Sequence, residues 1–243
     1  MKKILIIKHG SLGDVISSTA VIKPIRDYYK KSLITILTTK KYADFYDKSN
    51  FSNSIIKDNR KGIMNFIIII YKIISMKFDL VIDLQNSKRT FIYCLIIRLL
   101  SRSNINGTHL AANQRFKYNK KNPPHVIEGL SKQIEMLGIS SLKSPFLKWL
   151  EKENFSITEL ENKKYFLINP GCSSKNLVKR WPSKNFSEVC TFLISINIVP
   201  VVIGEGDDIQ PIKEIEKNEN RIINLYNKSP LDVIYNLSLK AEG

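Results

Sequence analysis

Short runs of apolar and β-branched residues alternate with longer segments of helical periodicity through the first part of the chain. The runs predict strands at Ile4–Ile7, Leu33–Leu37, Ser54–Ile56, Leu80–Leu84 and, more briefly, Ile105–Gly107. Strands that alternate with helical segments are typical of βαβ units, in which a parallel sheet is covered by helices on both faces. The pattern therefore predicts a doubly wound α/β domain.

The segments between these strands predict helices that begin near Asp14, Lys41, Met64 and Arg89. A further amphipathic pattern predicts a helix from His125 to Leu137, which Gly138 ends. We place the first domain at residues 1–145.

The apolar periodicity is lost from Ile139 to Lys164, so we expect a linker at residues 146–163. Residues 164–243 then resume the strand and helix alternation. Strands are predicted at Tyr165–Asn169, Val199–Ile203 and Arg221–Leu225, and helices at Ser183–Ile194, Asp208–Ile215 and from an N-cap at Ser229, with Pro230 in the first turn, to about Lys240. We expect two Rossmann-like doubly wound parallel-sheet domains, the second of them incomplete.

The composition is that of a globular protein, with 243 residues of which 43% are hydrophobic and 25% charged. Lys and Arg number 38 against 22 Asp and Glu, a formal charge of +16 that favours anionic partners. Lysine and isoleucine are abundant even in loops, so a compositional bias of the genome explains the charge equally well. We expect no nucleic-acid partner, since the chain has no RRM, KH or zinc motif and no basic stripe interleaved with aromatic residues.

Cysteine usage and the apolar runs indicate the compartment. The three cysteines lie far apart without CxxC spacing, which argues against a disulfide framework or a zinc site. The scattered histidines also predict no metal site. The apolar run at the N-terminus is too short for a signal peptide. The apolar run Ile63–Met76 is well short of the ~20 residues that cross a bilayer. We therefore expect a cytoplasmic protein.

The first candidate site is the glycine-bearing loop Lys8–Val15, which follows the first strand. Ligands of open α/β sheets bind beyond the carboxyl ends of strands, and Gly10 and Gly13 would let backbone amides approach one closely. The loop lacks the GxGxxG spacing, and no GxxxxGK[ST] occurs, so no dinucleotide cofactor is predicted. Asp14 is either the N-terminal cap of the next helix or a functional carboxylate.

Other polar residues follow later strands. Asp83, Gln85, Lys88 and Arg89 either meet an anionic sugar or form solvated surface. In the second domain, Ser173 and Ser174 either hold phosphate oxygens or are turn residues. Lys179 is either a cation at the ligand or a solvated lysine beside a Trp181 that we then expect to be buried. Glu205 either accepts hydrogen bonds from a ribose or belongs to a turn in which Asp208 caps the next helix.

Four segments, in order, resemble one family. They are the first strand with GSLGD and Ile22-Lys23-Pro24, then Phe78–Gln85 followed by Lys88-Arg89, then the helix opening at His125, and finally Asn169-Pro170-Gly171 with Lys179-Arg180-Trp181-Pro182. The combination resembles the ADP-heptose:lipopolysaccharide heptosyltransferases, glycosyltransferase family 9, which have the GT-B fold.

The resemblance implies a reaction, the inverting transfer of a heptose from ADP-heptose to a hydroxyl of the lipopolysaccharide inner core, without a metal or cofactor. Asp14 would be the base, and Lys179 would stabilise the leaving diphosphate. Ser173, Ser174, Arg180 and Glu205 are the implied nucleotide-sugar ligands, and Ser11, Gly13, Gln85, Lys88 and Arg89 are the implied acceptor ligands. The alternatives are a transferase of the same family with another glycan or protein acceptor, and a non-catalytic remnant.

The resemblance also sets an expectation for the end of the chain and for its location. Relatives continue into an Asp-x-Gly-Pro-x-His segment, whereas this sequence stops at Gly243, so we expect a C-terminally truncated chain, as a fragment or as a natural product. The lipid-linked oligosaccharide acceptor implies peripheral contact with the anionic inner face of the inner membrane.

Overall fold

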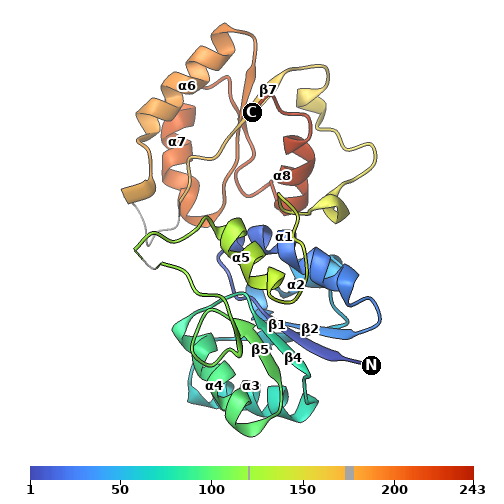
Figure 1. The fold of residues 1–243 in the computed structure, drawn as a ribbon. Helices are drawn as coiled ribbons and strands as arrows, with labels where there is room; N and C mark the ends of the chain where they lie inside the picture. The colour runs from blue at the N-terminus through green and yellow to red at the C-terminus, as the bar shows by residue number, and fades with distance from the viewer. Residues whose placement is uncertain (120, 173–177) are drawn as a thin grey trace. The chain divides into compact units, whose positions relative to one another are not determined.

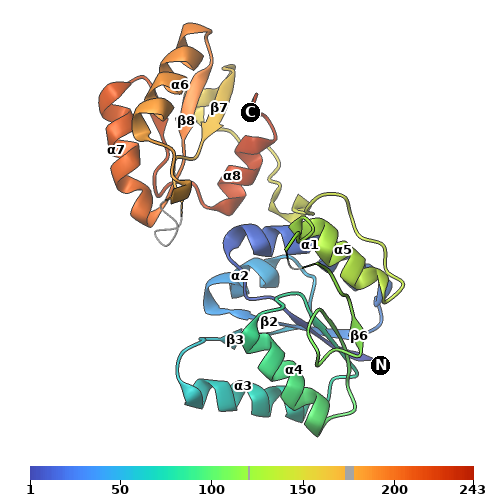
Figure 2. The same ribbon diagram turned by 60° about the vertical axis from the view of Figure 1, so that its left-hand side comes forward.

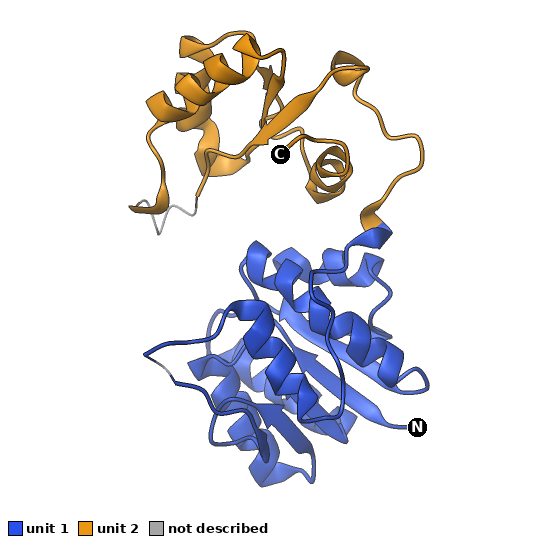
Figure 3. Ribbon diagram, turned by 45° about the horizontal axis from the view of Figure 1, so that its top comes forward, with its two compact units in different colours: residues 1–149 blue, residues 150–243 orange. Residues whose placement is uncertain are grey.

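The computed structural model describes residues 1–119, 121–172 and 178–243, which form two compact units (Figure 1). Unit 1 is Met1–Trp149 and unit 2 is Leu150–Gly243, coloured separately in Figure 3. Each is an α/β unit built on a parallel sheet, as the alternation of strands and helices predicts. Among the described residues, no helix combines the length and the apolar character needed to span a membrane.

Unit 1 contains a six-stranded parallel sheet in the order β3-β2-β1-β4-β5-β6. Its strands are β1 (Lys3–Ile7), β2 (Leu33–Thr39), β3 (Ser54–Asp58), β4 (Leu80–Asp83), β5 (Asn104–Gly107) and β6 (Gln114–Arg115). The chain winds outward from β1 in one direction through β2 and β3, and in the other through β4 to β6. The switch point therefore lies between β1 and β4, where a crevice at the carboxyl edge is the usual ligand site. The two-residue strand β6 was not predicted because it contains no apolar residue.

Helices cover both faces of this sheet (Figures 1 and 2). One face carries α1 (Leu12–Tyr28), α2 (Lys40–Lys48) and α5 (Val126–Glu135), and the other carries α3 (Ile63–Met76) and α4 (Lys88–Leu100). Because successive strand residues point to opposite faces, Ile4 and Ile6 pack in the α1 core while Leu5 and Ile7 pack in the α3 and α4 core. Burial of these β-branched and aliphatic side chains holds the layers together.

The segment that we predicted as a linker packs onto both units. Phe146 and Trp149 contact the core of unit 1, next to the 3-10 turn η1 (Lys148–Leu150). Leu160, in the turn η2 (Thr158–Leu160), is buried in unit 2. Isolated apolar residues in a non-periodic stretch carry no sequence signal for this packing.

Unit 2 has a three-stranded parallel sheet in the order β7-β8-β9. Its strands are β7 (Tyr165–Ile168), β8 (Val199–Val202) and β9 (Ile223–Asn224), and its helices are α6 (Ser183–Ser195), α7 (Ile209–Asn218) and α8 (Leu231–Ser238), with a 3-10 turn η4 (Gly206–Asp208) before α7. Helices α6 and α7 share one core and α8 packs in the other. The predicted N-cap at Ser229 was wrong by one residue, since Pro230 holds that position and α8 begins after it.

Strand β7 also gains backbone hydrogen bonds from the end of the chain. Glu242 N donates to Tyr165 O at 2.9 Å, and Leu167 N donates to Gly243 O at 2.8 Å. These bonds satisfy backbone groups on β7 that β8 does not reach.

Candidate functional site

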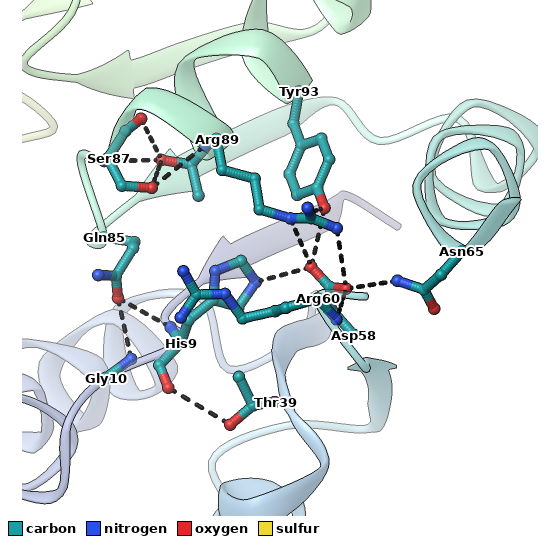
Figure 4. Close-up of polar contacts among 11 residues, drawn as sticks. His9, Gly10, Thr39, Asp58, Arg60, Asn65, Gln85, Ser87, Arg89 and Tyr93 are labelled. Carbon is teal, nitrogen blue, oxygen red and sulfur yellow. Dashed lines mark hydrogen bonds and ion pairs between the residues drawn. The ribbon is translucent and has the colours of Figure 1, made fainter. Parts of the chain in front are cut away.

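The carboxyl edge of the unit 1 sheet gathers polar residues from the loops after β1, β3 and β4 (Figure 4). Gln85 bridges the switch point, since its Oε1 accepts hydrogen bonds from the backbone N–H groups of His9 and Gly10, each at 2.9 Å. The side chain thus holds the glycine loop in place from the neighbouring strand. Its amide nitrogen has no hydrogen-bond partner in the described parts of the chain.

The two glycines of the loop differ in what they require. Gly10 has a φ of 72°, and a Cβ there would lie 2.3 Å from Val15 Cγ2, so only glycine fits. Gly13 has an ordinary φ, and a Cβ there would meet nothing within 4 Å. The backbone at Gly10 is therefore shaped by the fold, whereas the surface over Gly13 is open to a ligand.

Asp14 is half-buried in the first turn of α1. Its Oδ2 accepts hydrogen bonds from the backbone N–H of Ser11 at 3.3 Å and from the Ser11 hydroxyl at 3.0 Å. No described residue donates to Oδ1. The prediction of Asp14 as the N-terminal cap was wrong, since Ser11 holds that position, and Asp14 at the third position of the helix accepts a hydrogen bond from the Ser11 backbone instead.

Lys8 is a candidate that we did not predict. Its side chain is 4% exposed, and Nζ donates to Leu84 O at 3.2 Å. Burial lowers the pKa of Lys8, against the attraction of Asp14 and Asp83, which acts to raise it. The available sequence signal was a charged residue directly after an apolar strand, before a glycine loop.

Asp58, at the end of β3, is the centre of a buried polar cluster (Figure 4). Its carboxylate accepts hydrogen bonds from Arg60 N and Asn65 Nδ2, each at 2.7 Å, from the Tyr93 hydroxyl at 2.8 Å, and from Arg89 at 3.3 Å. Burial by itself would raise the pKa of Asp58, but the hydrogen bonds from Arg60, Tyr93 and Asn65 and the charge of Arg89 outweigh it, so the pKa is lowered.

Arg89, which the family resemblance implies as an acceptor ligand, belongs to this cluster. Its guanidinium donates to Asp58 and, at 2.6 Å, to the Tyr93 hydroxyl, and it lies over the ring of Phe66. Most of its hydrogen-bonding capacity is thus used inside unit 1. Lys88, by contrast, is exposed at the first position of α4.

His9 lies fully buried beside this cluster. Its Nε2 is 3.5 Å from Asp58 Oδ2, and neither ring nitrogen has a hydrogen-bond partner among the described residues. Burial lowers the pKa of His9 to about 4, although the charge of Asp58 opposes the shift. The imidazole is therefore neutral at physiological pH.

Three side chains that could hold a metal ion lie close together in unit 1. One ligand atom each from Asp83, Cys94 and His109 lies within 4.8 Å of the others. Asp83 already accepts the backbone N–H groups of Gln85 and Asn86 at 3.0 Å, and its Oδ2 lies 3.0 Å from His109 Nε2. Burial raises the pKa of the Cys94 thiol, which disfavours the thiolate that binds metals. These contacts explain the group as a support for the loop after β4, a grouping that the separate positions in sequence did not reveal.

The carboxyl edge of the unit 2 sheet is organised by Asp208. A Cβ at Gly171 would lie 2.2 Å from the Asp208 carboxylate, so the loop after β7 approaches that carboxylate as only glycine allows. Arg180 Nη2 lies 3.6 Å from Asp208 Oδ1, and Glu205 N donates to Asp208 Oδ2 at 3.3 Å. Asp208 therefore connects the loops after β7 and β8, besides standing before α7 as predicted.

The predicted donor ligands occupy different environments within unit 2. Lys179 is exposed, and Glu205 is exposed at the start of η4. Arg180 is half-buried, and its Nε is buried without a hydrogen-bond partner in the described chain. Ser173 and Ser174 lie outside the described residues.

The expectation of a buried Trp181 was wrong, because its side chain is 48% exposed and packs edge-on against Phe186 at a ring distance of 5.0 Å.

Unit 1 brings Ser11, Gly13, Asp14 and Gln85 together around one loop, whereas Arg89 belongs to the adjoining Asp58 cluster. Unit 2 brings Arg180 and Glu205 to a shared carboxylate. A hydrogen bond from Gly10 to Gln85 joins distant parts of the chain in unit 1, and an ion pair between Arg180 and Asp208 does so in unit 2, so sequence spacing alone could not define either grouping.

Each unit contains a parallel sheet with glycine-bearing loops at its carboxyl edge. This architecture is typical of nucleotide-binding proteins of the doubly wound class. The model of glycosyltransferase family 9 (heptosyltransferase) matches residues 69–241. The chain belongs to glycosyltransferase family 9.

Known proteins support the family and the fold. The chain is 22% identical over 206 residues to the lipopolysaccharide core heptosyltransferase OpsX of Haemophilus influenzae, covering 81% of this chain and 58% of that protein. The glycosyltransferase family 9 structure from Veillonella parvula matches with a TM-score of 0.77 at 19% identity, over 99% of this chain and 74% of the other. The ADP-heptose LPS heptosyltransferase II of E. coli matches with a TM-score of 0.72 at 18% identity, over 100% and 77%. The predicted α/β fold of GT-B type is confirmed.

Proposed function

We propose that this chain acts in the transfer of heptose from ADP-heptose to the lipopolysaccharide inner core, with inversion at the anomeric carbon. Membership of glycosyltransferase family 9 supports a glycosyl transfer. The names of its relatives, a lipopolysaccharide core heptosyltransferase and an ADP-heptose heptosyltransferase, support the donor and the acceptor. The chain spans 58% of the length of the Haemophilus influenzae heptosyltransferase, so the complete reaction is a proposal for this chain.

The environment of Asp14 is the observation that carries the proposal. An inverting displacement needs a base within hydrogen-bond reach of the acceptor hydroxyl. Asp14 keeps one carboxylate oxygen on Ser11, which fixes its orientation, and leaves the other without a donor among the described residues. The open space over Gly13 lies beside it in the same turn. Asp14 is thus suited to take the proton of a hydroxyl that approaches this loop.

Cationic residues of unit 2 suit the leaving group. As the bond to the sugar breaks, the terminal phosphate of ADP gains negative charge, and a fixed cation lowers the barrier. We assign this role to the exposed Lys179. Arg180 and Glu205, with Ser173 and Ser174, are proposed to hold the nucleotide sugar. The Nε of Arg180 is buried and has no hydrogen-bond partner among the residues that the structure describes, which supports a ligand contact.

Ser11, Gly13, Gln85 and Lys88 are proposed to line the acceptor side. The free amide nitrogen of Gln85 and the exposed ammonium of Lys88 suit oxygen-rich, anionic sugars. Arg89 would take part through the N–H groups that Asp58 and Tyr93 leave available.

The assignment is tested by measuring ADP release from ADP-heptose in the presence of a lipopolysaccharide acceptor. The protein is expressed from the complete natural reading frame. We expect Asp14→Asn to lower the rate by about 10² to 10⁴ with unchanged ADP binding. Lys179→Gln should lower it by about 10² to 10³. Asp27→Asn on the same helix α1, and Lys184→Gln on α6, remove charges of the same kind from exposed positions and should have little effect.

Each outcome separates the alternatives. Wild-type rates in both Asp14→Asn and Lys179→Gln would remove the assigned roles. Release of ADP only with a different glycan or protein acceptor would favour another transferase of the family. Binding of ADP without any transfer by the wild-type protein would favour the non-catalytic remnant.

We also propose that the protein works at the cytoplasmic side of the inner membrane through peripheral contact with its anionic surface. The formal charge of +16 and the lipid-linked acceptor support this. Binding to anionic vesicles that high salt weakens is the expected result.

A further inference from the structure

The outer face of α3 and α4 exposes far more apolar surface than a solvated helix pair requires. On α3, Ile63, Met64, Ile67, Ile68 and Tyr71 are between 53% and 77% exposed. Their spacing places them on one side of the helix, away from the buried Ile69 and Ile73. A contiguous apolar face of this kind on a globular protein marks an interaction surface.

Helix α4 continues the same surface. Ile92, Leu95, Leu99 and Leu100 are between 39% and 74% exposed. The two helices lie side by side in both views of the ribbon (Figures 1 and 2). Between them is an apolar groove of about 290 Å³, lined by Phe66, Ile67, Ile70, Tyr71, Ile74 and Leu100. Leu100 is the residue of α4 that lines the groove, and we call the exposed stripes of the two neighbouring helices together the α3–α4 face.

The charges around this face are predominantly basic. Residues 59–78 and 84–127 contain no Asp or Glu. The basic residues within the two helices and at their ends are Arg60, Lys61, Lys72, Lys77, Lys88, Arg89, Arg98 and Arg102. Of the nearby acids, Asp58 and Asp83 are buried, and the exposed Asp79 accepts a hydrogen bond from the backbone N–H of Lys3 at 2.7 Å. The α3–α4 face is therefore apolar at its centre and cationic at its margin.

This combination selects one kind of partner. Apolar side chains that lie flat along a helix enter the boundary between lipid headgroups and acyl chains, and surrounding Lys and Arg are attracted to anionic headgroups. A protein surface would satisfy the apolar centre, but a predominantly cationic margin repels a second copy of this chain. We propose that the α3–α4 face docks on an anionic lipid surface, an inference that rests on the proposed membrane contact and names the surface that makes it.

The test is sedimentation with vesicles of phosphatidylglycerol and phosphatidylcholine, compared with phosphatidylcholine alone. The double variant Ile67→Glu, Ile68→Glu should bind the anionic vesicles about tenfold more weakly or worse, because it removes two apolar side chains and adds two charges. The matched control is Phe192→Glu, Ile196→Glu in unit 2, which are 61% and 48% exposed and change the net charge equally. The control should bind like the wild type.

A milder pair guards against misfolding. Lys72→Gln, Lys77→Gln leaves the apolar residues in place and should weaken binding at low salt but not at high salt. Lys213→Gln, Lys217→Gln on α7 removes the same charge from exposed positions elsewhere and should leave binding closer to the wild-type value.

The outcomes are distinguishable. If the wild type binds anionic vesicles but both α3–α4 pairs bind as their controls do, the docking face is wrong while the membrane contact stands. If the wild type does not bind, the membrane contact itself fails. A dimer in lipid-free solution that Ile67→Glu, Ile68→Glu disrupts would identify a second copy as the occupant and overturn the proposal. Transfer to a delipidated, water-soluble acceptor should be unchanged in this variant, which separates docking from catalysis.

Discussion

The carboxyl edges of the two sheets show opposite ways to organise polar groups. In unit 1 the edge is held by buried groups that satisfy one another, with Asp58 accepting from four residues and Gln85 locking the first loop. In unit 2 one half-buried ion pair, Arg180 with Asp208, organises the edge, and Lys179 is exposed. The first edge is held by its own hydrogen bonds in the absence of a ligand, whereas the second presents charge to solvent.

The difference matches the demands of the proposed reaction. A base must be fixed relative to a hydroxyl, and small displacements lower the rate strongly. A cation that neutralises a diphosphate acts through charge, which tolerates a more open setting. We expect changes in the buried Asp58 cluster of unit 1 to act mainly through stability, and changes at the exposed Lys179 of unit 2 to act mainly on the reaction.

The largest effect is expected for Asp58→Ala. The variant leaves Arg89 without its buried carboxylate partner, together with the Tyr93 hydroxyl, so unit 1 should lose about 3 to 5 kcal/mol of unfolding free energy. The chain has one tryptophan in each unit, Trp149 and Trp181, so Trp149 fluorescence in a Trp181→Phe background reports on unit 1 during urea unfolding.

The control for Asp58→Ala is Asp27→Ala. Asp27 is 51% exposed and pairs with Lys23 on the surface of α1, and exposed pairs of this kind contribute about 1 kcal/mol or less. Equal losses in the two variants would show that the Asp58 cluster does not hold the unit 1 edge together.

The next largest effect is a pH dependence from His9. Its folded-state pKa of about 4 lies below the ordinary value of 6.5, so the unfolded chain binds the proton more readily between these values. The stabilisation from keeping His9 neutral is complete above pH 6.5 and is lost as the pH falls toward 4. It amounts to about 3 kcal/mol.

The measurement is the unfolding free energy of unit 1 as a function of pH, compared between wild type and His9→Leu. The leucine variant retains the acid response of the carboxylates but should lose the extra decline between pH 6.5 and 4. Parallel curves for the two proteins would mean that His9 gains its proton in the folded state as easily as in the unfolded one.

The same two edges show what the sequence could reveal. Strands and helices were predictable because β-branched runs, periodicity and glycines are local signals, and Gly10 and Asp14 were found through them. The hydrogen-bond partners of the site residues could not be predicted in this way. Gln85 meets Gly10 across 75 positions, and Tyr93 meets Asp58 across 35, because sheet order brings their strands together.

Two further features were missed for related reasons. For Arg89 the sequence left open a sugar ligand or solvated surface, and it gave no sign that a buried carboxylate from another loop would hold the guanidinium. The packing of Phe146 and Trp149 on unit 1 depends on a surface that only the folded sheet and helices create. Residue types indicated where polar groups would gather, and tertiary contacts decided which of them remained available.

The smallest stability effects are expected from two matched glycine substitutions, one at the carboxyl edge of each sheet. Gly171→Ala would place a Cβ 2.2 Å from the Asp208 carboxylate, which must then move away from Arg180. We expect unit 2 to lose about 1 to 3 kcal/mol, measured by Trp181 fluorescence in a Trp149→Phe background.

Gly13→Ala is the matched substitution in unit 1, where the new methyl group would meet nothing within 4 Å. Its stability should stay within about 0.5 kcal/mol of the wild type, as for surface positions that make no special contact. The methyl group would nevertheless occupy the space that we propose for the acceptor beside Asp14, so transfer should slow while ADP binding is unchanged. A Gly13→Ala protein that is stable and transfers at the wild-type rate would place the acceptor elsewhere on the unit 1 edge.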